Sequence, residues 1–252
     1  MADQGVLPRP LTLDVRECAL FLDLDGTLAP IAERPEDVGP NKARSGLLRA
    51  LSEQMQGRLA VISGRTIAEI DRILDGVVTS LAGVHGLEHR WPDGRIERGE
   101  PDPGLDAARR DIVEIAARFP NILIEDKGLA LAVHYRARPD AAEAVLDEAQ
   151  RISAATGLVI QRGEMVVELR GPGARKGDAV AAFMRVAPFA GKRPVFAGDD
   201  LTDEDGFSTV HLLGGEGVLV GPPRATAATA RLDDVSSVLA WLSAAIEGGV
   251  NA

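Results

Sequence analysis

An apolar run that ends in two carboxylates constrains this chain more than any other stretch. The segment reads Phe21-Leu22-Asp23-Leu24-Asp25-Gly26-Thr27-Leu28. Apolar residues followed by an Asp-Gly turn predict a buried strand that ends at Asp23. In an open α/β sheet the ligand crevice lies beyond the carboxyl ends of the strands. The sequence therefore predicts that Asp23 and Asp25 lie where a substrate binds.

The spacing of the two carboxylates favours phosphoryl transfer. One carboxylate can act as a nucleophile while the other carries protons. A purely structural alternative is a turn in which Asp25 bonds its own backbone. That alternative leaves Asp23 unexplained, because two neighbouring carboxylates repel each other unless a cation is present.

Short apolar runs alternate with helical patterns in most of the chain. Strands are predicted at 19–23, 59–63, 194–199 and 217–220, and apolar residues recur at helical spacing in 67–74, 180–187 and 235–246. Continuous apolar runs are typical of parallel strands that are buried on both faces. The alternation therefore predicts an α/β fold with a doubly wound parallel sheet.

The middle of the chain has a different order of elements. A helix at 105–119 precedes strands at 122–126 and 129–136, and a helix at 139–156 precedes strands at 158–162 and 165–170. Lys127-Gly128 and Gly163-Glu164 suit tight hairpin turns. Pro and Gly residues at 101–104 and 171–173 indicate linkers. We therefore expect an inserted α+β domain (αββαββ) at 103–171, with a catalytic core made of 1–102 and 172–252.

Two further segments are expected to handle a phosphate at the same edge. The hydroxyl of Ser63 and the backbone amides of Gly64 and Arg65 follow the second strand, where they can hold an anion. Ser63 as a helix cap explains this position equally well. Lys176 opens a later helix, where its ammonium could screen a phosphate from an attacking carboxylate, although a solvated surface lysine is the simpler alternative.

A third segment, Gly198-Asp199-Asp200-Leu201-Thr202-Asp203-Glu204, predicts a metal site. Closely spaced aspartates after a buried strand are unfavourable without a divalent cation. Oxygen ligands favour Mg²⁺ over zinc, and the four histidines have no zinc-site spacing.

Charge and composition exclude several classes of partner. A net charge of -10 disfavours binding to nucleic acid or an anionic membrane. The single cysteine, Cys18, excludes an internal disulfide, and Met1 to Thr12 lack the apolar core of a signal peptide. No run approaches the roughly 18 apolar residues of a membrane span. We expect a cytoplasmic protein, with a monomer favoured, that acts on a small molecule.

Taken in order, these segments resemble the haloacid dehalogenase (HAD) phosphatase superfamily, in particular its trehalose-6-phosphate phosphatase branch. The resemblance covers nearly the whole chain and implies a HAD-like core with a cap inserted between the second and third motifs. It implies that Asp23 forms an aspartyl-phosphate and that Asp25 protonates the leaving sugar oxygen and later activates water. It also implies that Mg²⁺ is bound by Asp23, the backbone carbonyl of Asp25 and Asp199, with Asp203 acting through water.

Four segments carry the resemblance to the trehalose branch, three of them within the predicted cap and one, Leu81 to Glu88, before it. They are Leu81 to Glu88, Glu125-Asp126-Lys127, His134-Tyr135-Arg136 and Val166 to Leu169. The resemblance implies that Glu125, Lys127 and Glu168 hold sugar hydroxyls, while ordinary charges at hairpin ends are the alternative. The roles of His85 and His134 stay open. The expected activity is hydrolysis of trehalose 6-phosphate; a phosphatase for another sugar such as sucrose 6-phosphate, a phosphomutase and a silent sugar-phosphate sensor are the alternatives.

Overall fold

The computed structural model describes residues 7–173 and 175–250, so the first half of the segment Met1 to Thr12 lies outside the described residues. The chain divides into two compact units, one made of residues 7–97 with 175–250 and the other of residues 98–173. Across these ranges, no helix has both the length and the apolar composition that a bilayer crossing requires.

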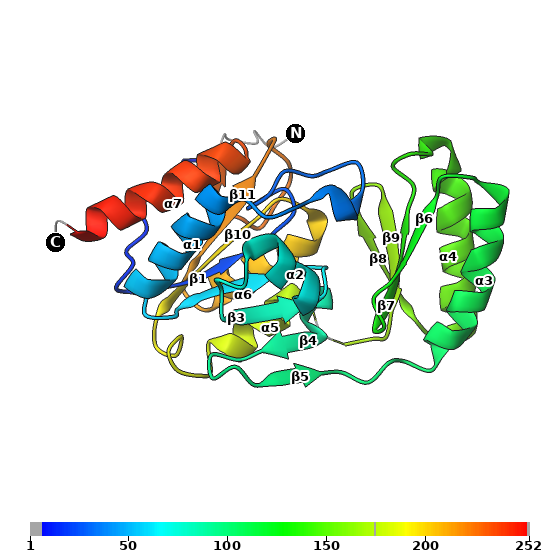
Figure 1. Ribbon diagram of the computed structural model, residues 1–252, viewed down its shortest axis with the longest axis horizontal. Coiled ribbons are helices and arrows are strands. Elements are labelled where there is room, and N and C mark those ends of the chain that lie inside the picture. Colours follow the sequence, from blue (N-terminus) through cyan, green and yellow to red (C-terminus); the bar gives the residue numbers. More distant parts are fainter. Residues whose placement is uncertain (1–6, 174, 251–252) are drawn as a thin grey trace. The chain divides into compact units, whose positions relative to one another are not determined.

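A mostly parallel sheet forms the centre of the first unit. Counted over the described residues it has eight strands, in the order β12-β11-β10-β1-β2-β3-β4-β5, and β4 runs antiparallel to β3. Figure 1 shows the strands of this unit. Their bounds are β1 Cys18–Leu22, β2 Leu59–Ile62, β3 Ser80–Gly83, β4 Glu88–Arg90, β5 Ile96–Arg98, β10 Arg193–Gly198, β11 Glu216–Val220 and β12 Ala230–Leu232.

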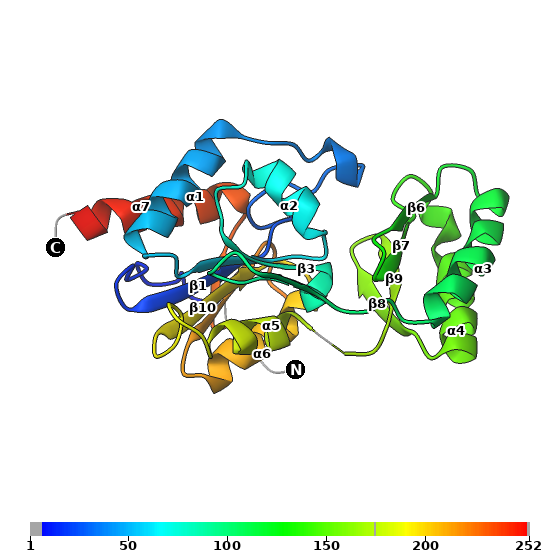
Figure 2. The ribbon, with the colours of Figure 1, turned by 60° about the horizontal axis from the view of Figure 1, so that its bottom comes forward.

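Helices cover both faces of this sheet. Leu20 and Leu22 of β1 belong to one apolar cluster with α1, α2 and α7, while Phe21 belongs to a second cluster with α5 and α6. Figure 2 shows these two groups of helices on opposite sides of the strands. The expected doubly wound architecture is therefore confirmed. The helices are α1 Lys42–Gln54, α2 Ile67–Leu74, α5 Lys176–Phe183, α6 Glu204–Leu212 and α7 Val235–Val250.

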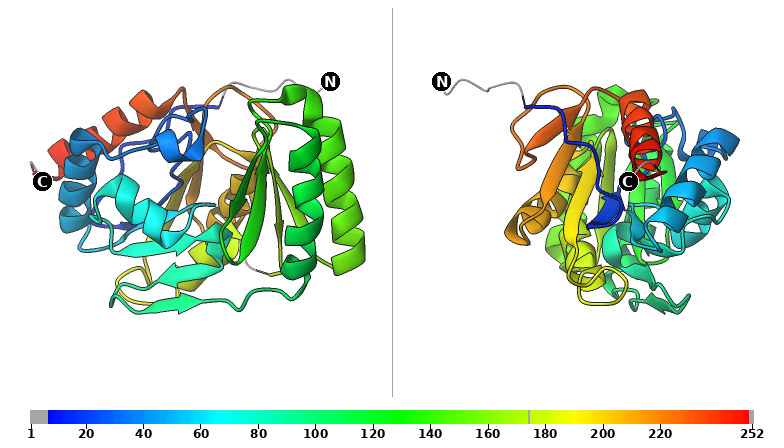
Figure 3. Two further views of the ribbon diagram at one scale, coloured as in Figure 1. Left: turned by 45° about the vertical axis from the view of Figure 1, so that its right-hand side comes forward. Right: turned by 90° about the vertical axis from the view of Figure 1, so that its left-hand side faces the viewer.

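The second unit is an antiparallel sheet with helices on one face. Its strand order is β6-β7-β9-β8. Leu131 and Val133 of β7 pack with Ile112 of α3 and Ile152 of α4 in one buried cluster, and the helices lie side by side in Figure 3. Because side chains alternate along a strand, Ala132 and His134 point to the opposite face. The elements are α3 Gly104–Arg118, β6 Leu123–Asp126, β7 Ala130–His134, α4 Ala142–Thr156, β8 Val159–Gly163 and β9 Val166–Arg170.

The structure also contains elements that the sequence patterns did not predict. The strands β4, β5 and β12 are each three residues long, and all three residues of β5 are exposed. Such short strands at or near a sheet edge have too few residues to show an alternation of apolar and polar positions. The four-residue strand β3 and the helices α1 and α6 were likewise not among the predicted elements.

Candidate active site

The acidic site lies where three adjacent strands end. In the sheet order β10-β1-β2, Asp199 follows β10, Asp23 follows β1 and Ser63 follows β2. The amide of Asp23 donates to the carbonyl of Ala197 at 2.9 Å, which ties the loop after β1 to β10. Parallel strands present their carboxyl ends at one edge, so tertiary structure brings together residues that are far apart in the sequence.

Lys176 is the buried cation of this site. Its Nζ lies 2.8 Å from Oδ1 of Asp23 and 2.7 Å from Oδ1 of Asp203. The lysine side chain is 2% exposed, which contradicts the surface-lysine alternative. A buried ammonium is stable only when it is paired. Lys176 therefore orients Asp23 and offsets part of the negative charge around it.

Asp23, Asp199 and Asp203 form a cluster that fits a divalent cation. Each offers one carboxylate oxygen, and these oxygens lie within 4.8 Å of one another. Oδ1 of Asp199 is buried without a hydrogen-bond partner. Carboxylate oxygens around an unsatisfied buried acceptor suit a hard cation such as Mg²⁺. The expectation for Asp25 concerned its backbone carbonyl, on which this side-chain geometry does not bear.

Only glycine fits at position 26, beside Asp199. Its φ is +78°, and a Cβ at this position would lie 2.0 Å from Oδ2 of Asp199. Gly198, the last residue of β10, is similar, because a Cβ at that position would lie 2.3 Å from Cγ of Asp203. Both glycines therefore make room for the carboxylates of the cluster.

Burial and crowding raise the pKa of two of these carboxyl groups. Burial raises the pKa of Asp23 to about 7; the charge of Lys176 opposes this rise, and that of Asp203 adds to it. Burial raises the pKa of Asp199 to about 9, and the charges of Asp23 and Asp203 add to this rise. Burial would lower the pKa of Lys176, but Asp203 and Asp23 hold it above its usual range. One ammonium thus does not neutralise the cluster, which favours a further cation.

Asp25 has a different partner from Asp23. Nε of Arg65 donates to Oδ2 of Asp25 at 2.7 Å, and a terminal nitrogen of Arg65 donates to Oδ1 at 2.8 Å. Such a two-bond contact between a guanidinium and a carboxylate fixes both the position and the plane of the carboxylate. The side chain of Arg65 therefore contacts a predicted catalytic group, a contact that the sequence did not predict.

The residue that follows the loop 63–65 caps the helix α2. Thr66, not Ser63, caps α2, because its side chain accepts from the amide of Glu69 in a capping box. The helix-cap alternative for Ser63 is therefore wrong; its hydroxyl accepts instead from the amide of Arg65 at 3.2 Å.

The loop that follows β3 supports the loop 63–65. Its residues Val84 and His85 have positive φ values of 46° and 55°.

Hydrogen bonds hold this strained backbone in place. The amide of Val84 donates to the carbonyl of Arg65 at 2.8 Å, and the amide of His85 donates to the carbonyl of Ser63 at 2.9 Å. The ring of His85 abuts Gly64, where a Cβ would lie 2.6 Å from Nε2. Non-glycine residues with positive φ persist only where surrounding contacts determine them. His85 therefore shapes the loop 63–65.

The second unit carries the three predicted sugar-binding residues on one face of its sheet. Glu125, Ala132, Glu168 and Gln161 are paired in register across β6, β7, β9 and β8. Nζ of Lys127 lies 2.7 Å from Oε2 of Glu168.

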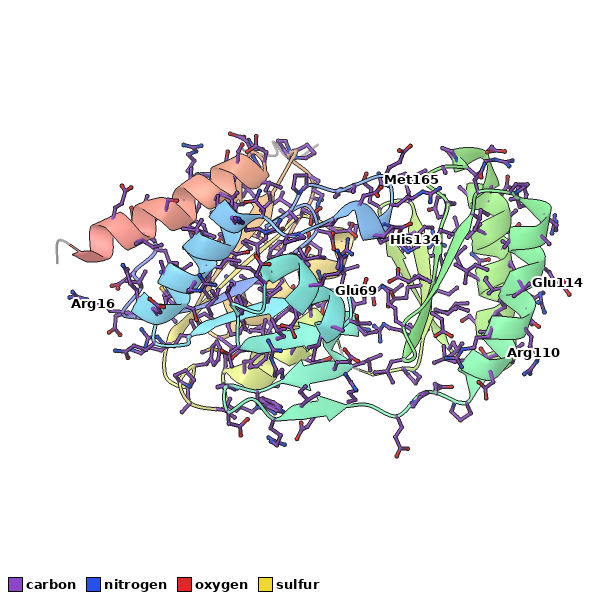
Figure 4. All side chains as sticks on the ribbon, in the orientation of Figure 1. Arg16, Glu69, Arg110, Glu114, His134 and Met165 are labelled. Carbon is purple, nitrogen blue, oxygen red and sulfur yellow. The ribbon has the colours of Figure 1, made fainter. Side chains whose placement is uncertain are left out.

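His134 lies on the same face of this sheet. Its Nε2 lies 2.8 Å from Oε2 of Glu125, and it projects away from α3 in Figure 4. Polar side chains from β6, β7, β8 and β9 thus lie on the face of the sheet opposite α3 and α4.

Sequence reasoning missed several polar residues near these groups. Nε of Arg170 donates to Oε1 of Gln161 at 2.9 Å, and both residues share the face of Glu168. Because Arg170 lies two residues after Glu168 on β9, the alternation of side chains along a strand could have indicated that the two share a face. Arg224 donates to the backbone carbonyl of Asp200 at 2.9 Å and also contacts Glu204. It lies in an irregular loop, where no periodic signal exists.

Comparison with known proteins agrees with this geometry. The family model for trehalose-phosphatase matches residues 21–236. A probable trehalose-phosphate phosphatase of Sinorhizobium fredii (strain NBRC 101917 / NGR234) is 41% identical over 215 residues, which cover 84% of this chain and 81% of that protein. The trehalose-6-phosphate phosphatase of Escherichia coli (strain K12) is 43% identical over 230 residues, which cover 89% and 85%.

A solved structure shows the same likeness. The crystal structure of a trehalose-6-phosphate phosphatase related protein matches with a TM-score of 0.77 and 26% sequence identity. The match covers 92% of this chain and 98% of that one.

Proposed function

Because the chain belongs to the trehalose-phosphatase family of the HAD superfamily, we propose that it hydrolyses trehalose 6-phosphate to trehalose and inorganic phosphate. The observation that carries the proposal is the different pairing of the two adjacent carboxylates. Asp23 contacts Lys176 within the acidic cluster, whereas Asp25 contacts Arg65. Lys176, the ammonium proposed to contact the phosphate, thus places Asp23 where a nucleophile is needed, whereas Arg65 holds Asp25 in a separate position from which it can exchange a proton with the leaving group or water.

The proposed reaction has two steps on these residues. In the first, an oxygen of Asp23 forms a bond to phosphorus while the bond from phosphorus to the sugar oxygen breaks, and Asp25 gives its proton to that oxygen. In the second, Asp25 takes a proton from water, the water oxygen attacks phosphorus, and the bond to Asp23 breaks. Phosphate leaves and both carboxyl groups return to their starting states.

We propose Mg²⁺ as the cofactor. Asp23, Asp199 and the backbone carbonyl of Asp25 would hold the cation, with Asp203 in support. The unsatisfied Oδ1 of Asp199 and the all-oxygen cluster support this assignment. When bound, the cation would supply positive charge that lets a carboxylate approach an anionic phosphate.

Phosphate and sugar would be held by different groups. We propose that Ser63, the backbone amides of Gly64 and Arg65, and the ammonium of Lys176 hold the phosphate. We propose that Glu125, Lys127 and Glu168 hold hydroxyls of the sugar, because carboxylates and an ammonium suit partners that both donate and accept hydrogen bonds.

We also keep three broader expectations as proposals. Residues 103–171 would form an inserted cap domain between two core segments, 1–102 and 172–252. The protein would act as a monomer on a small-molecule substrate in the cytoplasm. The buried single cysteine, Cys18, is compatible with a reducing compartment.

Phosphate release from a panel of sugar phosphates tests the proposed function. The panel contains trehalose 6-phosphate, sucrose 6-phosphate and glucose 6-phosphate, each with Mg²⁺ and with a chelator, and Asp23→Asn serves as the inactive control. We expect rapid Mg²⁺-dependent release from trehalose 6-phosphate alone. Preference for another sugar phosphate would change the substrate, and transfer without release would indicate a mutase. Tight binding without turnover would indicate a sensor.

A further inference from the structure

The side chain of Arg65 is held as firmly as the carboxylate that it contacts. It is 8% exposed, and besides its two bonds to Asp25 it donates to the carbonyl of Pro35 at 2.9 Å. Oε1 of Glu69, at the N-terminus of α2, lies 3.6 Å from the guanidinium; Figure 4 labels Glu69 on that helix. The guanidinium is therefore anchored on elements outside the acidic cluster.

The position of Arg65 separates two carboxylates that are two residues apart. Among the described residues the group that could hold a cation consists of Asp23, Asp199 and Asp203, and the side chain of Asp25 is not part of it. A carboxylate beside a divalent cation is attracted to it. A carboxylate that became an additional ligand could no longer carry a proton. A fixed guanidinium that engages both oxygens of Asp25 opposes that movement.

We propose that Arg65 is a positioning residue that holds the carboxylate of Asp25 outside the cation site and in a fixed plane. The proposal rests on the proposed function, because it concerns the proton carrier of that reaction. It goes beyond the expected role of the segment 63–65 in phosphate binding, which concerned the backbone amide of Arg65. The two roles of Arg65 belong to different atoms, so substitution of the side chain can separate them.

A double-mutant cycle tests whether Arg65 acts through Asp25. The kcat and KM of wild type, Arg65→Gln, Asp25→Asn and the double variant are measured at saturating Mg²⁺. We expect Arg65→Gln to lower kcat about 100-fold, as a misplaced catalytic group does, with KM changed less than about threefold. In the Asp25→Asn background the same substitution should lower kcat by less than about threefold. Equal losses in both backgrounds, or a loss that appears mainly in KM, would overturn the proposal in favour of a direct contact with phosphate.

A matched control distinguishes this effect from the loss of any buried ion pair. Arg90 makes a contact of the same form with Asp71, at 2.7 and 2.9 Å, and also donates to the backbone carbonyls of Val78 and Thr79. Arg90→Gln should leave kcat unchanged. A comparable loss of kcat in Arg90→Gln would show that general destabilisation explains the result for Arg65.

Calorimetric titration with Mg²⁺ gives a readout that does not depend on turnover. We expect Arg65→Gln to bind Mg²⁺ as tightly as wild type or more tightly, because Asp25 becomes free to approach the cation. Loss of Mg²⁺ binding in a folded variant would overturn the proposal. If Arg65→Gln does not fold, Arg65→Lys serves in its place, because lysine keeps the charge but cannot bind both oxygens of a carboxylate at once. The same tests then apply, with an expected loss in kcat of about tenfold.

Failure of the proposed function would be visible separately. If wild type releases no phosphate from trehalose 6-phosphate but hydrolyses p-nitrophenyl phosphate, the substrate assignment is wrong. The cycle is then measured with p-nitrophenyl phosphate, because hydrolysis of the aspartyl-phosphate still requires Asp25. The coupling between Arg65 and Asp25 is thus decided by either substrate.

Discussion

Replacement of Gly26 by alanine should remove the cation site without unfolding the protein. The new Cβ would lie 2.0 Å from Oδ2 of Asp199. Ordinary carbon contacts lie at about 3.5 Å, so the carboxylate would have to move by roughly 1.5 Å. Misplacement of a functional group by about 1 Å can lower a rate on the order of 100-fold. We therefore expect Gly26→Ala to lower kcat at least 100-fold and to weaken Mg²⁺ binding.

Gly214→Ala provides a matched control for the backbone strain in this experiment. The φ of Gly214 is +76°, nearly the same as the +78° of Gly26, but nothing lies within 4 Å of a Cβ at that position. Both substitutions force alanine into the left-handed region at about 1–2 kcal/mol. For a chain of this size each kcal/mol corresponds to roughly 2–4 °C in Tm. The strain contribution to stability should therefore be similar in both variants.

Three measurements compare the variants: thermal unfolding without metal, calorimetric titration with Mg²⁺, and phosphate release from trehalose 6-phosphate. We expect Gly214→Ala to lose stability alone and to keep wild-type kcat and Mg²⁺ affinity. Wild-type kcat and Mg²⁺ affinity in Gly26→Ala would refute the reasoning, because Asp199 would then tolerate displacement or have no part in the site. Equal losses of activity in both variants would show that strain, not contact with Asp199, is responsible.

Three other substitutions or conditions have defined outcomes. Asp23→Asn should abolish turnover while Tm at pH 8 stays equal or rises, because a buried carboxylate is removed at nearly constant volume; more than trace activity would place the nucleophile elsewhere. Without metal, Tm should fall as pH rises from about 4 to 9, because folded Asp23 and Asp199 keep their protons to about pH 7 and 9 whereas unfolded carboxyl groups lose them near 4. Saturating Mg²⁺ should flatten this dependence, and a metal-free Tm that rises over the range would contradict the burial argument. Glu168→Ala, which takes a partner from Lys127, should weaken transition-state binding of trehalose 6-phosphate by roughly 1–3 kcal/mol, seen as a lower kcat/KM. Hydrolysis of p-nitrophenyl phosphate should stay nearly unchanged; a parallel loss on both substrates would assign Glu168 to the fold.

Local patterns in the sequence were enough to predict the class of fold and most of the candidate residues. Apolar periodicity depends on neighbours in the chain, so the strand before Asp23, the helix at 67–74 and the two hairpins could be predicted. The carboxylates also stood out locally, because their spacing at strand ends is visible without any coordinates. The three-residue strands β4, β5 and β12 were missed because so few residues carry no period.

The pairing of the charged groups, in contrast, became visible only once the chain was folded. Lys176 reaches Asp23 and Asp203, and Arg65 reaches Asp25, across loops that the order of strands in the sheet brings to one edge. Short-range sequence patterns do not carry these pairings, because each depends on the direction of a side chain and on the packing of distant elements. The positive φ values of Val84 and His85 have the same origin. Their backbone is held by hydrogen bonds to a neighbouring loop, and local propensity opposes the conformation that those bonds impose.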